Sequence, residues 1–162
     1  GQPFDARGAW AATGQVSTSV LALMQQDQFF QLSGPRSTGR DHFHATWLSG
    51  KLEGHDHLAP ADVQATLCEL TAWSISRSIT NRVKKAVVCG GGVFNDTLMD
   101  RLTQRLAPVP VIASDDAGIP AMEVEAAAFA WLASQTLLGL PGNVTEVTGA
   151  AGPRILGAVY PA

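Results

Sequence analysis

The sequence contains few cysteines, few charges and no long apolar run. Its two cysteines, Cys68 and Cys89, lie on separate expected elements and in no metal or redox spacing, which favours reduced thiols in a cytosolic protein. The net charge of −3 and the lack of any basic run argue against a nucleic-acid or anionic-membrane surface. The longest apolar run, 126–133, is too short to cross a bilayer. We therefore expect a cytoplasmic protein whose partners include neither nucleic acid nor a membrane.

The residues that are present suffice for one globular domain. With 162 residues, 46% of them hydrophobic and 15% charged, the chain can bury a core without disulfides or metals. Helix-type and strand-type segments alternate along the sequence. This alternation predicts an α/β fold in which an apolar run ending before Gly90 pairs in parallel with a second short strand over 108–112.

Four further segments carry structural expectations. The pattern over 16–30 predicts one amphipathic helix with an exit turn, and 155–160 is typical of a last strand. Pro60 begins the longest helix, expected to run to about residue 83, and its wide apolar face predicts packing against a sheet. The segment 121–138 is apolar nearly all round, so we expect a buried helix there.

Three successive glycines, Gly90, Gly91 and Gly92, separate the first strand from a helix that opens at Asn95. Without Cβ atoms such a turn can adopt positive φ and let a ligand approach the backbone closely. The spacing matches neither a P-loop nor the dinucleotide-binding fingerprint. A tight strand-to-helix turn without a ligand explains the glycines equally well. The helix is indicated by apolar residues at helical spacing, namely Leu98, Met99, Leu102 and Leu106.

A polar stretch over 34–41 carries two arginines and two hydroxyl side chains close together. Arg36 and Arg40 supply guanidinium groups suited to phosphate or carboxylate, and Ser37 and Thr38 supply further donors. The alternative is a solvated loop in which Thr38 caps the next helix.

Four histidines within sixteen residues raise the question of a metal site. We expect none, because His42 and His44 would point away from each other on a helix, while His55 and His57 lie in a loop without a nearby cysteine.

Two glutamates lie at the start of the apolar helix over 121–138. Glu123 and Glu125 can simply complement the helix dipole. Because the helix is expected to be buried, Glu125 could instead face a cleft.

Several segments, taken in order, resemble one enzyme family. They are 34–41, 62–72, 88–95, 125–133, 139–143, 147–150 and 156–161. Together they resemble the C-terminal half of the anhydro-N-acetylmuramic acid kinases, and the match extends over essentially the whole chain. Gly34 and Arg36 stand where that family more often has proline and lysine, and Asp41 stands where it has glutamate.

The resemblance implies a two-lobed kinase of the sugar kinase, Hsp70 and actin superfamily, in which 1–162 is an incomplete C-terminal lobe of actin-like (ribonuclease H-like) fold. It implies a reaction with ATP and Mg²⁺ that opens the 1,6-anhydro ring of the amino sugar. The product is N-acetylmuramic acid 6-phosphate, formed in peptidoglycan recycling. The family also tends to dimerise, which leaves a homodimer open.

The resemblance also implies roles for particular residues. The glycines 90–92 and Asn95 match the adenosine motif of the superfamily, so we expect them to border the nucleotide. Glu125 matches a family glutamate that we place towards the sugar cleft. The loop 36–40 matches a signature loop with a cleft-facing or lobe-shaping role.

Other family parts are missing from the sequence. These are the Gly-Thr-Ser-x-Asp-Gly phosphate loop, the aspartate that serves as general base, and a Gly-Pro-Gly-Asn turn. Since the chain begins without methionine, we expect a fragment whose general base lies upstream of Gly1. Phosphoryl transfer needs donors around the γ-phosphate and an oriented nucleophile, so we expect this chain alone to be inactive.

Two other classes of protein remain open. A non-catalytic ligand-binding or regulatory domain built on a degenerate sugar-kinase lobe would also lack the phosphate loop. A flavodoxin-like or Rossmann-like module would fit the α/β alternation, but the sequence lacks the glycine fingerprint of the Rossmann type.

Overall fold

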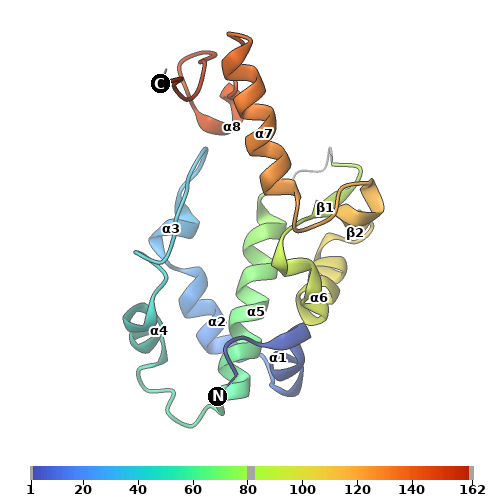
Figure 1. The fold of residues 1–162 in the computed structure, drawn as a ribbon. Coiled ribbons are helices and arrows are strands. Elements are labelled where there is room, and N and C mark those ends of the chain that lie inside the picture. Colours follow the sequence, from blue (N-terminus) through green and yellow to red (C-terminus); the bar gives the residue numbers. More distant parts are fainter. Residues whose placement is uncertain (1, 80–82, 161–162) are drawn as a thin grey trace.

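The computed structural model describes residues 2–79 and 83–160, which fold around one long central helix, α5 (Pro60–Arg77) (Figure 1). Pro60 occupies the first helical position, where its missing N–H would have no partner in the helix. The carboxylate of Asp62 accepts the backbone N–H of Gln15 over 2.7 Å and fixes the preceding chain to this end of α5. The helix ends at Arg77, earlier than the sequence indicated; 80–82 lie outside the described residues.

The other helical elements are short. They are η1 (Ala6–Gly8), α1 (Ala9–Thr13), α2 (Thr18–Gln25), α3 (Gln28–Gln31), α4 (Ala45–Leu52), η2 (Gly91–Phe94), α6 (Asp96–Leu106), η3 (Ser114–Ala117), α7 (Val124–Leu137) and α8 (Thr145–Thr148).

The sheet consists of β1 (Ala86–Val88) and β2 (Val111–Ala113), which pair in parallel with Ala86 opposite Val111. Helix α6 connects the two strands, so the expected α/β unit with parallel pairing is confirmed. The second strand starts later than the sequence indicated. Pro110 has no N–H to donate, although its carbonyl accepts the N–H of Ala86 over 2.9 Å.

The expectation that α5 packs against a sheet is wrong. Its apolar face contacts α1, α2 and α6 instead. Two strands of three residues offer too little area for a helix of this length, and α6 already packs on β2. The main core cluster forms where α5 meets α2 and α3, and its buried members are Val20, Met24, Phe30 and Leu70.

The single helix expected over 16–30 is divided in two. Helix α2 ends at Gln25, and the Asp27 carboxylate accepts the N–H of Phe29 over 2.9 Å, which caps the start of α3. An aspartate in this position favours a new helix start over continuation of the first helix.

The last strand expected over 155–160 is also absent from the described residues. This segment lies against α7, where Gly157, Ala158 and Val159 face Leu132 and Thr136 across a shared hollow. Because α7 leads the chain away from β1 and β2, the segment has no strand edge within reach (Figure 1).

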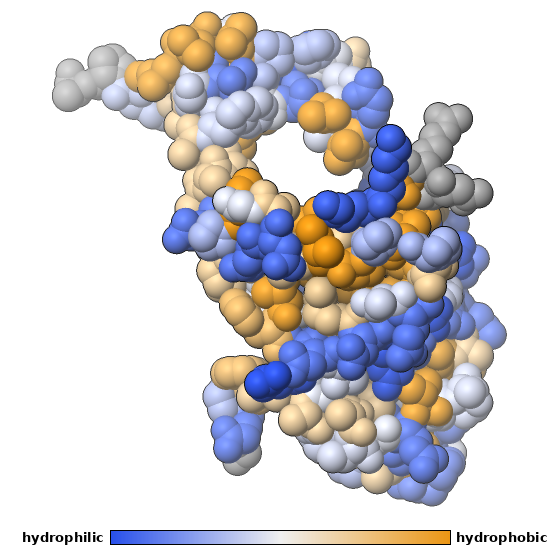
Figure 2. Space-filling view, turned by 90° about the vertical axis from the view of Figure 1, so that its right-hand side faces the viewer, coloured by the Kyte–Doolittle hydropathy of each residue, from blue (hydrophilic) through white to orange (hydrophobic). Residues whose placement is uncertain are grey.

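Helix α7 is exposed, which corrects the expectation that it is buried. None of its residues is buried, and Phe129 and Trp131 remain 64% and 51% exposed. Its composition predicted burial, but the segment that lies against it, 155–160, covers only part of its surface. Figure 2 shows an opening through the molecule between its upper part and its body. No helix in the described chain, α7 included, combines the length and hydropathy that a membrane span requires.

Candidate functional site

The three glycines form the turn between β1 and α6 that the sequence predicted. Gly90 adopts φ of 72°, a region open mainly to glycine, and Gly91 and Gly92 begin the short helix η2. The positive φ therefore falls on Gly90 alone among the three glycines. The sequence could place the turn but could not say which glycine carries the unusual conformation.

Open space lies in front of the turn. A Cβ atom added to Gly90 or Gly91 would meet no other heavy atom within 4 Å, and one added to Gly92 would lie 3.8 Å from Leu98 Cδ2. The first two glycines thus present bare backbone on an unobstructed side. This arrangement fits a ligand that lies directly against the main chain.

Asn95 has a structural role in the described chain. Its Oδ1 atom accepts the N–H of Leu98 over 2.9 Å and caps α6. The side chain also packs so closely on Gly8 that a Cβ atom there would lie 2.1 Å from Asn95 Oδ1. The Thr97 hydroxyl donates to the Gly8 carbonyl over 2.8 Å, which fixes the same contact. The side-chain nitrogen of Asn95 has no hydrogen-bond partner within 2–79 and 83–160, so it can still meet a ligand.

The turn lies at the carboxyl edge of the parallel pair, where α/β proteins bind their ligands. The segment after β2 reaches the same edge: Gly90 donates its N–H to the Ala121 carbonyl over 2.8 Å. The Ala121 N–H in turn donates to Asp115 Oδ2 over 3.2 Å.

Ser114 is a polar residue at this edge that sequence reasoning missed. It begins η3, the short helix that follows β2, and is only 4% exposed. Its hydroxyl has no hydrogen-bond partner in the part of the chain that the structure describes. A serine directly after a short apolar strand was the available signal.

Glu125 lies in the first turn of α7 and is exposed. Because α7 is not buried, burial does not direct this carboxylate into a cleft, contrary to the expectation from the sequence. The hydrogen bond between Gly90 and Ala121 nevertheless places the start of α7 beside the glycine turn. Neither Glu123 nor Glu125 makes a side-chain cap to the helix. The position is compatible with a role at the same site.

The loop over 34–41 is exposed throughout, up to Asp41, and its two arginines separate. Arg36 lies over the Phe29 ring, with its guanidinium carbon 5.2 Å from the ring centre. Arg40 borders another hollow together with Phe43. In Figure 1 this loop and the glycine turn lie on opposite sides of α5.

The alternative role of Thr38 as a helix cap is wrong. Helix α4 starts at Ala45, and His44 caps it: its Nδ1 atom accepts the N–H of Trp47 over 3.2 Å. The helix expected to include His42 therefore begins later. Thr38 instead borders a small hollow beside Phe29, and Ser37 is exposed.

Asp27, which the sequence analysis did not single out, holds the segment after this loop in place. Asp27 accepts hydrogen bonds from Trp47 Nε1 over 2.8 Å and pairs with His42 Nε2 over 2.9 Å. Burial raises the pKa of Asp27, but the bonds from Trp47, Phe29 and His42 outweigh it and hold the pKa below its usual value. The three contacts make Asp27 a fixed anchor between α3 and α4.

A second half-buried acid joins α5 to α6. Glu69 pairs with both Arg101 and Arg105, the latter with Nε 2.7 Å from Glu69 Oε1. Burial raises the pKa of Glu69, and the two guanidinium groups lower it by more, so that the net shift is downwards. This ion pair holds the helix that follows the glycine turn against the central helix.

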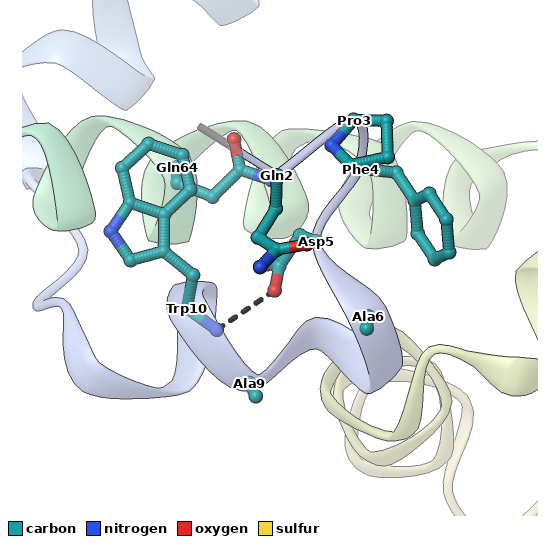
Figure 3. Close-up of a pocket in the computed structure, with 8 residues that line it drawn as sticks. All are labelled: Gln2, Pro3, Phe4, Asp5, Ala6, Ala9, Trp10 and Gln64. Atoms are coloured by element: carbon teal, nitrogen blue, oxygen red, sulfur yellow. Dashed lines mark hydrogen bonds between the residues drawn. The ribbon is translucent and has the colours of Figure 1, made fainter.

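Figure 3 shows a large open hollow of about 900 Å³ near the N-terminal end of the described chain. Its walls come from 2–6, α1 and Gln64 of α5. Asp5 cannot serve as a free acid there, because it accepts the N–H groups of Trp10 over 2.8 Å and Ala11 over 2.9 Å. Sequence reasoning did not predict this hollow, and the glycine turn does not border it.

A protein-held metal site does not form among the described residues. In 2–79 and 83–160 no three His, Cys, Asp or Glu side chains come close enough to hold an ion together. His55 and His57 lie near each other, with ring centres 6.1 Å apart, but no third ligand joins them.

Comparison with known proteins agrees with the motif order seen in the sequence. A family model described as anhydro-N-acetylmuramic acid kinase matches residues 1–162. The chain is 52% identical to the anhydro-N-acetylmuramic acid kinase of Cupriavidus pinatubonensis, covering 99% of this chain and 44% of that relative. It is 53% identical to the enzyme of the same name from Pseudomonas paraeruginosa, covering 100% of this chain and 45% of the relative. The chain thus spans less than half the length of these curated relatives. It belongs to the anhydro-N-acetylmuramic acid kinase family.

Proposed function

We propose that this chain forms part of an ATP-dependent kinase that opens 1,6-anhydro-N-acetylmuramic acid and phosphorylates it to N-acetylmuramic acid 6-phosphate. The observation that carries the proposal is the family match over 1–162, which includes the turn at 90–92. In a bacterial cell this reaction would serve peptidoglycan recycling in the cytoplasm. ATP and the amino sugar are its small-molecule partners. A second copy of the enzyme is its protein partner, in a homodimer.

The glycine turn supplies the adenosine side of the nucleotide site in this proposal. Gly90 and Gly91 leave their backbone open to a planar ligand, and Asn95 has a side-chain nitrogen to donate. The site lies at the carboxyl edge of β1 and β2, where short loops present backbone groups to a ligand. These residues bind and orient the nucleotide and do not themselves transfer the phosphoryl group.

Glu125 is our candidate for contact with the sugar. It is exposed at the start of α7, which the Gly90–Ala121 hydrogen bond holds next to the nucleotide turn. A carboxylate there can accept hydrogen bonds from sugar hydroxyl groups and orient the ring. The loop with Arg36, Ser37, Thr38 and Arg40 lies across α5 from the glycine turn, so we assign it a lobe-shaping role in preference to direct contact with the transferred phosphoryl group.

Mg²⁺ would neutralise the charge of the phosphates in such a reaction. The described residues do not fit a cation site of their own, as no acidic cluster forms. We therefore derive no step through the ion. The general base and the phosphate loop are likewise not among the residues of this chain.

The proposal is tested with the full-length enzyme that carries these 162 residues. Formation of ADP should depend on the anhydro sugar, and mass spectrometry should detect its 6-phosphate with one oxygen from solvent water. N-Acetylmuramic acid without the anhydro bridge serves as the control substrate. If ADP forms equally fast without any sugar, or if no 6-phosphate appears, the assigned reaction is wrong.

A further inference from the structure

A second polar hollow, of about 540 Å³, lies between the 34–36 segment, the end of α5 and α8. Arg36 comes from the loop and Arg77 from the last turn of α5, and both border it. Ser74 of α5 and Ser78, which caps its C-terminal end, also border the hollow. Their hydroxyls donate to the carbonyls of Thr71 and Ser74. None of the nine residues that line the hollow is acidic. The family resemblance gave Arg77 no role, and the sequence gave no reason to place it beside Arg36.

Both guanidinium groups lie over aromatic rings. Arg36 lies over Phe29 at 5.2 Å, and Arg77 lies over Trp73 at 5.0 Å. The two rings belong to one cluster, because Phe30 contacts Phe29 at 5.4 Å and Trp73 at 5.2 Å between ring centres. A guanidinium stacked by its face keeps its N–H edge free for an acceptor. The aromatic cluster therefore fixes two donor forks beside the same hollow.

Neither arginine has an acidic partner within 2–79 and 83–160. Arg36 donates only to the Leu32 carbonyl, and Arg77 makes no hydrogen bond there. Three other arginines have acidic partners: Arg7 pairs with Asp96, and the pair on α6 shares Glu69. The C-terminal end of α5 adds roughly half a negative charge nearby, which two full positive charges exceed. The hollow is thus positively charged.

We propose that Arg36 and Arg77 form a binding site for a phosphate group. Two guanidinium forks offer more donors than one carboxylate has lone pairs to accept. A phosphate monoester has three terminal oxygens and close to two negative charges, which matches both the donors and the charge. The ligand class is therefore a free phosphate ion or a small phosphorylated metabolite. This inference goes beyond the proposed kinase reaction, and it shares no residue with the glycine turn.

The test is a calorimetric titration of the full-length protein with inorganic phosphate at constant ionic strength. We expect saturable binding with a dissociation constant on the order of 1 mM. Arg36→Gln and Arg77→Gln should each weaken it about tenfold, because each removes one charge-assisted pair. Arg154→Gln is the matched control: this exposed arginine bonds to the neighbouring Pro153 carbonyl and lies outside the hollow, so affinity should stay unchanged.

Titrations with two phosphorylated compounds identify the source of the phosphate. If glucosamine 6-phosphate binds more tightly than inorganic phosphate, the ligand is a sugar phosphate. If adenosine monophosphate binds more tightly than inorganic phosphate, the ligand is a nucleotide. If all three bind with equal affinity, the ligand is the free phosphate ion. Each of these results supports the site if the two variants weaken it. The proposal is overturned if the wild-type protein shows no saturable binding, if acetate binds as tightly, or if Arg154→Gln weakens phosphate as much as Arg36→Gln. Since no arm requires catalysis, failure here is distinct from failure of the kinase proposal.

Discussion

The backbone N–H of Gly90 donates to the carbonyl oxygen of Ala121 over 2.8 Å and joins two segments that lie thirty-one residues apart. One is the turn after β1, and the other is the approach to α7. The bond leaves the N–H of Gly90 unavailable to a ligand but brings the candidate nucleotide and sugar residues to one edge of the sheet. A change at either end should therefore affect both.

The first prediction concerns Gly91. Its φ is not positive and its Cβ position is open, so Gly91→Val should leave the fold intact and place a side chain where we expect adenosine to lie. In the full-length enzyme we expect the Michaelis constant for ATP to rise about tenfold with little change for the sugar, as expected when binding of only one substrate is disturbed. Steady-state kinetics with each substrate varied in turn measures both constants.

Gly90→Ala provides the comparison, because Gly90 carries the positive φ of 72°. A side chain there is strained whatever binds, so this variant should lose stability by about 1–2 kcal/mol. If a folded Gly91→Val enzyme keeps its Michaelis constant for ATP, the turn does not border the nucleotide.

The second prediction concerns Glu125. Glu125→Gln in the full-length enzyme should lower turnover about tenfold or more, because a carboxylate that orients the sugar acts on the reaction. Its melting temperature should stay within a few degrees, since the side chain is exposed. Glu123→Gln, two residues earlier and also exposed, is the control and should keep normal turnover. The opposite pattern, a stability loss of about 0.3–1 kcal/mol with normal kinetics, would assign Glu125 to the helix dipole.

The third prediction concerns pH and Glu69. Its folded pKa lies below its ordinary value of 4.5, so the stability that it contributes is present above pH 4.5 and is lost as pH falls through the folded pKa. Glu69→Gln should destabilise the chain by about 2 kcal/mol at pH 7, less than for a fully buried pair because Arg101 and Arg105 keep some contact with water. The difference from wild type should shrink towards pH 3.

Urea unfolding at a series of pH values measures this third effect. Glu53→Gln changes an exposed glutamate that has no ion-pair partner in the described chain and should leave the curve unchanged. A constant gap between wild type and Glu69→Gln from pH 7 to pH 3 would mean that packing, and not the charge pair, accounts for the loss.

The fourth prediction concerns the 162-residue chain by itself. It holds the residues proposed for adenosine but no phosphate loop, so nucleotide binding there rests on base and ribose contacts. Adenosine, ADP and ATP should bind with similar dissociation constants at the glycine turn, on the order of 1 mM or weaker. Magnesium should not tighten binding, and no hydrolysis should occur. Titrations are best made in the Arg36→Gln variant, which weakens the competing phosphate site. Micromolar, magnesium-dependent ATP binding would contradict the prediction.

Local patterns in the sequence predicted the elements that rest on local chemistry. The apolar run before Gly90, the glycines and the apolar spacing after Asn95 gave the strand, turn and helix. The parallel partner near Ile112 followed from the alternation of elements. These features depend on neighbours in the sequence and on backbone propensity, and the structure contains all of them.

Features that depend on contacts between distant segments were not predictable. Nothing in the sequence indicated that α5 would pack on helices, that Asp27 would anchor His42, or that Arg36 would share a hollow with Arg77. The apolar composition of α7 predicted burial, but composition cannot say which segment does the covering. Asn95 shows the same limit, because its close packing on Gly8 joins segments far apart in the chain.

The exposure of α7 has a consequence for the rates of amide hydrogen exchange. A helix of fourteen residues that packs little against its neighbours depends on its own hydrogen bonds, and isolated helices of that length are marginal in water. The hydrogen bonds of α7 should open locally, so its amides should be among the fastest to exchange. The amides of α5, packed on three helices, should exchange only with global unfolding. A protection boundary is therefore expected near Ala121, the residue whose carbonyl the Gly90 N–H holds.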